Sequence, residues 1–117
     1  MRIRARQGQA LLLQAEARSL GYALDPTLRV LDVRTEAEHR SHRLPNAVLV
    51  PVQELEQRLH ELDREANWLV HCEHGRRSLW ACEVLAQAGF QRLANLSGGL
   101  AYWSGSGLPL ETGPLGR

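Results

Sequence analysis

The sequence predicts an α/β fold, in which helices flank both faces of a mainly parallel sheet. Short apolar runs alternate with longer segments in which apolar residues recur at helical spacing. This alternation is typical of strand–helix–strand units, because parallel strands need a long crossover connection. The apolar runs cover 29–34, 47–50, 68–70 and, more weakly, 91–96. Runs that are short and continuously apolar also fit a sheet that is buried on both sides.

The chain has the size and composition of a single soluble domain. Its 117 residues are 44% hydrophobic and 23% charged, so it can form a core without disulfides or metals. We expect one domain over 1–117, with a core at about 9–111 and an irregular tail at 112–117. The formal net charge is +1 and the basic residues are scattered, which gives no indication of a nucleic-acid or membrane partner.

The basic N-terminal segment is followed by a short apolar run at 10–13. This run is too short for a signal peptide, and Gln14, Glu16 and Arg18 interrupt the sequence after it. No stretch of the sequence is long enough to cross a membrane. We therefore expect a cytoplasmic location.

The first two elements are expected to be a helix and a buried strand. Apolar residues such as Leu12 and Ala15 have helical spacing over 9–20, and Gly21 can end that helix. The segment 29–34 then predicts a short strand, because it combines valines and a leucine in one line.

A short helix and a second strand should follow. Thr35 and Glu38 have the spacing of a capping box, so we expect a helix that begins there and stops before Pro45. The apolar run 47–50 predicts a strand, and leucines at helical spacing predict a helix over 53–62.

The second half of the chain repeats the alternation. The strand at 68–70 leads into a polar loop and a helix, which Gly89 can end. A weaker strand covers 91–96, and a last short helix is expected at 100–103. The segment 105–117 is rich in Gly and Pro, and we expect it to be irregular.

Cys72 occupies the most informative position in the sequence. It lies at the carboxyl end of a predicted strand and just before a helix, where open α/β sheets bind ligands. The first turn of a helix presents unpaired N–H groups and partial positive charge, which stabilise an anion. A cysteine there ionises more easily than a free thiol. A structural alternative is a buried cysteine that merely ends a strand.

The residues after Cys72 modify this environment. Gly75 allows a tight turn, and Arg76 and Arg77 add positive charge. Glu73 acts in the opposite direction, because a carboxylate beside the sulfur disfavours the thiolate. His74 can donate or accept a proton near neutral pH.

The second cysteine, Cys82, follows ten residues later in a helical pattern. Ten helical residues span about 15 Å, whereas the Cα atoms of a disulfide lie within about 7 Å. Both thiols are therefore expected to be free, as in a reducing compartment. Cys82 fits a small apolar side chain in the core. The sequence shows neither a Cys-x-x-Cys pair nor zinc-ligand spacing, so we expect no metal.

For other polar and aromatic residues, the sequence indicates a position or role less strongly. Asp32 and Arg34 should lie near the Cys72 loop, because neighbouring parallel strands end at the same edge. We expect them to form an ion pair that braces this edge, and a direct role of Arg34 remains equally open. Ser78 is expected to cap the helix or to donate to the sulfur. Surface positions are expected for His39, His42 and His60, and core or pocket-wall positions for Trp68, Trp80 and Trp103.

Four motifs, in order, resemble those of the single-domain rhodanese (thiosulfate sulfurtransferase-like) family. They cover 31–34, 43–47, 72–78 and 96–99, and together they span most of the chain. The second motif departs from the family pattern, since His42, Arg43 and Asn46 stand at its usual Gly, His and Gly places. His39 stands where an aromatic residue is usual.

This resemblance implies a five-stranded, mainly parallel sheet, with the fifth strand near Ile3. It also implies that Cys72 attacks thiosulfate or a similar small anionic donor and becomes a persulfide. Cyanide or a cellular thiol would then accept the sulfur, a protein acceptor is possible, and no cofactor is implied. The substrate-binding residues implied are Glu73, His74, Gly75, Arg76, Arg77 and Ser78, with Asp32 and Arg34 as loop support.

Two alternative functions remain. A cysteine phosphatase or arsenate reductase would fit the His-Cys pair and the following Arg-Ser. However, only four residues separate Cys72 from Arg77, one fewer than in the phosphatase loop, so the cradle is smaller. The other alternative is a non-catalytic rhodanese-like module that binds a partner, although such modules often lack the cysteine.

Overall fold

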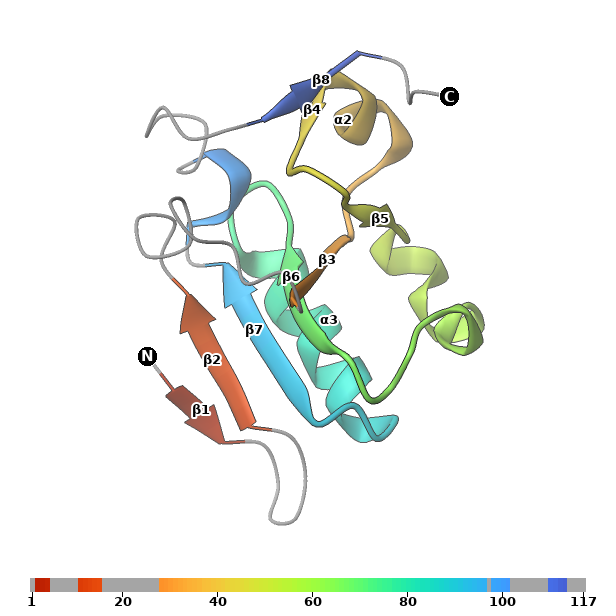
Figure 1. Cartoon of the computed structure of the whole chain (residues 1–117), viewed down its shortest axis with the longest axis vertical. Coiled ribbons are helices and arrows are strands. Elements are labelled where there is room, and N and C mark those ends of the chain that lie inside the picture. Colours follow the sequence, from red (N-terminus) through yellow and green to blue (C-terminus); the bar gives the residue numbers. More distant parts are fainter. Residues whose placement is uncertain (1, 5–10, 16–27, 97, 102–109, 114–117) are drawn as a thin grey trace.

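The computed structural model describes residues 2–4, 11–15, 28–96, 98–101 and 110–113. Its centre is a six-stranded sheet with the order β1-β2-β7-β6-β3-β5 (Figure 1). The strands are β1 (Arg2–Arg4), β2 (Leu11–Ala15), β3 (Leu28–Asp32), β5 (Val48–Leu49), β6 (Asn67–His71) and β7 (Arg92–Leu96). β1 pairs with β2 in antiparallel fashion, and the other neighbours in this sheet are parallel. The predicted fold class is confirmed.

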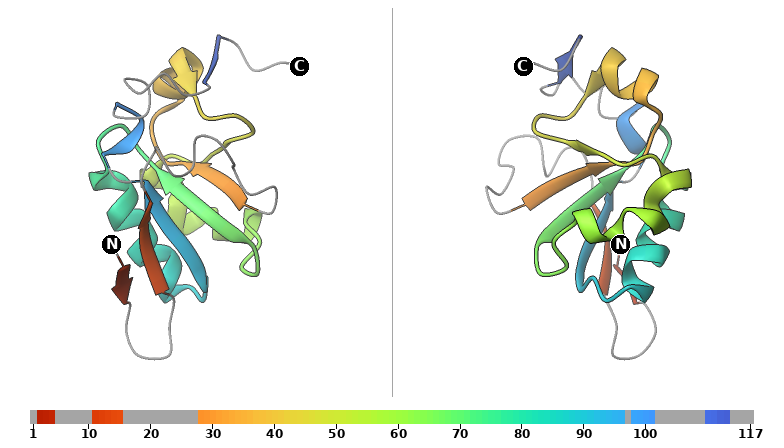
Figure 2. Two further views of the ribbon diagram at one scale, coloured as in Figure 1. Left: turned by 60° about the vertical axis from the view of Figure 1, so that its left-hand side comes forward. Right: turned by 90° about the vertical axis from the view of Figure 1, so that its right-hand side faces the viewer.

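One face of the sheet is covered by three helices of the described part of the chain. They are α3 (Arg76–Gln87) and the short 3₁₀ helices η1 (Val52–Gln57) and η2 (Leu59–Glu61). The side views show α3 lying along this face (Figure 2). Buried residues of β3, β6 and β7 form one core cluster with this helical layer, including Trp68, Leu85 and Phe90.

The opposite face of the sheet has its own, smaller core cluster. Val30 and Leu69 alternate with the inward residues of the first cluster, as the pleat of a strand requires. Leu44 and Leu100 cover them, and Leu100 belongs to the helical residues 99–101. The sheet is therefore buried on both sides, as its continuous apolar strands predict.

A second, two-stranded sheet lies beyond the carboxyl end of β3. It pairs β4 (His42–Arg43) with β8 (Glu111–Thr112), and α2 (Glu36–Ser41) packs beside it (Figure 1). Arg43 donates through Nη1 to the carbonyls of His39 and Gly113, at 3.0 and 2.8 Å. The C-terminal segment is thereby attached to the chain that follows β3.

The local patterns at the start of α2 and the end of α3 are confirmed. Thr35 and Glu38 form both halves of the capping box. Gly89, just after α3, has a positive φ of 98°, which glycine adopts without strain. Within the described residues, no helix is long and apolar enough to span a membrane.

Three predictions about the elements were wrong. In the segment 9–20, residues 11–15 form β2 rather than part of a helix, because pairing with β7 overrides the local spacing. Residues 9–10 and 16–20 lie outside the described residues. The strand expected near Ile3 is present as the antiparallel edge strand β1, and β2 is a further strand, so the described sheet has six strands rather than five.

The helix predicted over 53–62 is instead the two 3₁₀ turns η1 and η2, separated at Arg58. Arg58 holds both turns together through ion pairs with Glu54 and Glu61. In the tail, Glu111 and Thr112 form β8 where irregular chain was predicted, because β4 offers them a pairing partner.

Candidate active site

Cys72 lies at the carboxyl edge of the large sheet, in the turn between β6 and α3. β6 ends at His71 and α3 begins at Arg76, so the loop is short. Cys72 is buried, with 1% of its surface exposed. The predicted placement, at the end of a strand and the start of a helix, is confirmed.

The sulfur of Cys72 is surrounded by hydrogen-bonding groups. The backbone N–H of Gly75 donates to Sγ at 3.1 Å, and the Ser78 hydroxyl oxygen lies 3.4 Å from Sγ. Gly75 has a φ of 97°, a left-handed conformation that glycine adopts without strain, and the chain turns there from the loop into α3. The turn that sequence reasoning expected of this glycine is present.

Ser78 is itself hydrogen-bonded to Oδ1 of Asn95, which comes from β7. Both side chains are buried. Sequence reasoning missed Asn95, although a polar residue inside an otherwise apolar strand was a usable signal. The three residues thus form a chain of contacts from the loop into the sheet.

These contacts affect the ionisation of the thiol. Burial raises the pKa of Cys72, since it removes water from the charged form. Hydrogen bonds from the Ser78 side chain and from loop backbone N–H groups act in the opposite direction and lower the pKa below its ordinary value. The site therefore makes the thiol more acidic than a free cysteine.

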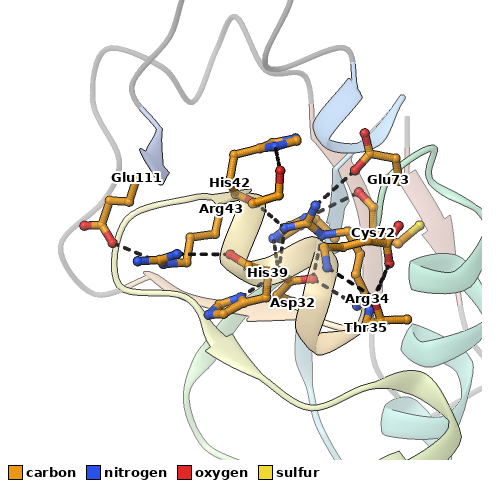
Figure 3. A network of polar contacts seen from close by, with 12 residues as sticks. Asp32, Arg34, Thr35, His39, His42, Arg43, Cys72, Glu73 and Glu111 are labelled. Carbon is orange, nitrogen blue, oxygen red and sulfur yellow. Dashed lines mark hydrogen bonds and ion pairs between the residues drawn. The ribbon is translucent and has the colours of Figure 1, made fainter. Parts of the chain in front are cut away.

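Arg34 connects the loop to the end of β3 (Figure 3). Its guanidinium forms a two-point ion pair with Asp32, at 3.0 Å from Oδ1 and 2.8 Å from Oδ2, as predicted. The same group donates to Glu73 Oε1 at 3.0 Å and to the His42 carbonyl at 2.6 Å. Arg34 is 1% exposed, so its charge is neutralised by these acceptors rather than by water.

Asp32 accepts from more than one partner. Nδ1 of His39 lies 2.8 Å from Asp32 Oδ2 (Figure 3). Burial raises the pKa of Asp32, but Arg34, His71 and His39 together outweigh it and lower the pKa. The carboxylate therefore stays ionised inside the protein.

The predicted surface position of His39 was wrong. His39 is 1% exposed, because α2 turns this side chain toward Asp32. His42 is partly buried, and His60 is exposed as expected. The charged residues next to His39 in the sequence suggested a surface position, but the hydrogen bond to the buried Asp32 carboxylate explains why His39 is buried.

His71 lies beside the same carboxylate at the end of β6. Its Nε2 is 3.9 Å from Asp32 Oδ2 and has no hydrogen-bond partner among the described residues. Burial is the main reason that its pKa falls to about 4. His71 is therefore neutral at physiological pH, so it adds no positive charge next to Cys72.

Arg77 forms an ion pair with Glu38, for which the sequence had indicated a place in the capping box of α2. Its two Nη atoms donate to the two carboxylate oxygens of Glu38, at 2.9 and 3.0 Å. Hydrogen bonding by Arg77 is the main cause that lowers the pKa of Glu38 to about 2. In contrast, Arg76 and His74 are exposed.

A second segment supports the loop from the other side. The backbone N–H groups of Leu100 and Ala101 donate to the carbonyls of Cys72 and Glu73, both at 2.9 Å. Gly99 has a φ of 70°, and a Cβ there would overlap the Glu73 carbonyl. Gly99, the last residue of the fourth motif, therefore lies directly against the cysteine loop.

Cys82 and the tryptophans were expected to be core or pocket-wall residues. Cys82 is buried in α3, and burial raises its pKa to about 12, which fits the predicted core position. Both cysteines are free. Trp68 is buried as expected, Trp80 is 51% exposed and contradicts the prediction, and Trp103 lies outside the described residues.

The arrangement suits covalent chemistry at sulfur. A buried thiol with a lowered pKa is a nucleophile, and N–H groups directed at it stabilise a sulfur anion. Among the described residues, no cluster of three His, Cys, Asp or Glu side chains could hold a metal ion.

Comparisons with known proteins agree with this geometry. A family model described as a rhodanese-like domain matches residues 11–106. A protein from Allochromatium vinosum named sulfurtransferase is 34% identical over 99 residues, which cover 83% of this chain and 92% of that protein. A protein from Actinobacillus pleuropneumoniae named thiosulfate sulfurtransferase GlpE is 41% identical over 54 residues, 46% of this chain and 50% of that protein.

A solved structure has the same fold. The crystal structure of a rhodanese-related protein from Thermoplasma volcanium superposes with a TM-score of 0.78 at 31% identity. The match covers 85% of this chain and 97% of that one. The chain therefore belongs to the rhodanese-like domain family.

Proposed function

We propose that this protein is a sulfurtransferase of the rhodanese type that carries sulfane sulfur on Cys72. The observation that carries this proposal is the environment of Sγ: a buried thiol of lowered pKa that accepts the Gly75 N–H at 3.1 Å. The sulfurtransferase names of related proteins support the same reaction class.

The first step would transfer one sulfur atom. The Cys72 thiolate attacks the outer sulfur of thiosulfate, an S–S bond forms, and the S–S bond of the donor breaks. Sulfite leaves with its two negative charges, and Cys72 carries a persulfide anion. No oxidant is needed, because the electron pair of the broken bond leaves with sulfite.

The second step would return Cys72 to its starting form. A cellular thiol, cyanide in the laboratory, or a protein thiol attacks the outer persulfide sulfur, and the Cys72 thiolate leaves. The Gly75 N–H and the Ser78 hydroxyl, which already contact Sγ, would stabilise the anion in both forms. Arg76, which is exposed at the helix start, would attract an anionic donor.

Asp32 and Arg34 would act through the loop rather than on the substrate. Arg34 holds Glu73 at 3.0 Å, so the loop keeps its shape when the sulfur changes charge. Glu73 is also the acidic neighbour that sequence reasoning expected to oppose the thiolate. Its pairing with Arg34 neutralises much of that effect.

Intact-protein mass spectrometry after incubation with thiosulfate tests the proposal. The wild type is expected to gain one sulfur atom, and Cys72→Ala is expected to gain none. Cys82→Ala is the matched control, since it removes the other thiol and should still gain sulfur. Sulfur uptake by Cys72→Ala, or no uptake by the wild type from either thiosulfate or a thiol persulfide, would contradict the proposal.

A further inference from the structure

The arginines around Cys72 are mostly already neutralised. Arg34 is paired with Asp32 and with Glu73, and Arg77 is paired with both carboxylate oxygens of Glu38. Arg76 forms no ion pair with any described residue. The loop is therefore less cationic than its sequence indicates.

The ion pair between Arg77 and Glu38 is held in place by a second interaction of the Glu38 carboxylate. Oε1 of Glu38 also accepts the backbone N–H of Thr35 at 2.9 Å, as part of the capping box of α2. The carboxylate is thus held in place at the helix start while it binds the guanidinium. The two side chains are only 36% and 32% exposed, so water screens them incompletely.

The occupied guanidinium limits what Arg77 can do for a substrate. The pair with Glu38 uses one N–H of each Nη and offsets the positive charge of Arg77, so the remaining N–H groups attract an anionic donor less strongly. A dianion near Arg77 also meets the negative charge of Glu38. A donor with one negative charge or none at its transferring end is affected less.

We propose that Glu38 is a specificity-determining residue, which neutralises Arg77 and disfavours dianionic sulfur donors relative to thiol persulfides. The inference rests on the proposed function, because it concerns the donor half of that reaction. With a persulfide donor, the Cys72 thiolate attacks the outer sulfur of R–S–SH. Cys72 then carries –S–SH, and R–S⁻ leaves with the electron pair of the broken S–S bond.

The test variant is Glu38→Gln. Glutamine can still accept the Thr35 N–H, so the capping box remains while the negative charge is removed. We expect the ratio of kcat/KM for thiosulfate to kcat/KM for the persulfide of 2-mercaptoethanol to increase about two- to fivefold, as for a partly exposed ion pair. The increase should shrink as salt concentration rises.

Glu36→Gln is the matched control. It makes the same change of charge in the same helix, but Glu36 pairs with Arg40 on the exposed side and not with Arg77. The donor ratio of this variant should equal that of the wild type. Thermal unfolding of both variants checks that α2 is intact.

The possible outcomes distinguish a failure of the role proposed for Glu38 from a failure of the proposed sulfurtransferase function. If the wild type transfers sulfur and the ratio for Glu38→Gln equals that for Glu36→Gln, the role of Glu38 is wrong and the proposed function stands. A lower ratio for Glu38→Gln would also overturn it, because Glu38 would then be orienting Arg77 toward the dianion. If the wild type takes sulfur from neither donor, both proposals fail together.

Discussion

Ser78 has one hydroxyl proton and two neighbours that can accept it. With Cys72 as a thiol, the S–H donates to Ser78 Oγ and the hydroxyl donates to Asn95 Oδ1. When Cys72 loses its proton, the hydroxyl can rotate and donate to the thiolate instead. The direction of the Ser78 O–H bond thus depends on whether Cys72 is a thiol or a thiolate.

Replacing Ser78 with alanine should therefore raise the pKa of the Cys72 thiol, because the thiolate loses a donor while burial still disfavours it. The pH dependence of alkylation by iodoacetamide, measured in a Cys82→Ala background, reports the pKa of Cys72 alone. We expect the midpoint to move to higher pH. An unchanged midpoint would show that the backbone N–H groups alone keep the pKa of Cys72 low.

At the scale of elements, the cysteine loop depends on the segment 98–101. Leu100 and Ala101 hold the loop carbonyls, and Gly99 lies so close to Glu73 that no side chain fits between them. Two segments that are distant in sequence thus share one tightly packed backbone contact.

Gly99→Ala should displace the loop and reduce the rate of sulfur transfer by about tenfold or more, in line with the cost of misplacing reacting groups. Gly113→Ala is a well-matched control. Both glycines have positive φ, 70° and 82°, but a Cβ at Gly113 would meet nothing within 4 Å. Single-turnover rates of persulfide formation compare the two. Equal losses would mean that backbone strain, not the contact with the loop, is responsible.

Elements with strong local signals were predictable from the sequence. The strand before Cys72 is apolar, and the capping box of α2 needs only Thr35 and Glu38. β2 was not predictable, because its strand state depends on pairing with β7 at the far end of the chain. For the same reason the candidate site was predicted only in part. Local sequence placed Cys72, but the burial of His39 and the pairing of Glu38 depend on other elements.

At the scale of the whole molecule, a buried neutral histidine links stability to pH. The pKa of His71 falls from its ordinary value of 6.5 to about 4, mainly through burial. The unfolded chain therefore binds a proton in this range that the folded protein does not bind. As far as His71 is concerned, the free energy of unfolding is therefore highest above pH 6.5 and decreases as pH falls toward 4.

His71→Asn should remove this dependence. Between pH 7 and pH 5, the free energy of unfolding of the wild type should fall by about 2 kcal/mol more than that of the variant. Urea denaturation at the two pH values measures the difference. His60→Asn, at an exposed position, should behave like the wild type. Parallel pH profiles for wild type and His71→Asn would assign the acid sensitivity to other groups.

The order of strands in the sheet differs from their order in the chain. Leu11 pairs with Arg92 and Ala15 with Leu96, so β2 is synthesised early and its partner β7 late. On the ribosome, β2 cannot reach its place until most of the chain has been made. Until then β2 can pair with β1 on one edge, but the backbone N–H and C=O groups on its other edge have no native partner, and they form an open edge that other chains can bind. Slow translation between β2 and β7 would prolong that exposure, so the rate of synthesis itself should influence how much of this protein folds rather than aggregates.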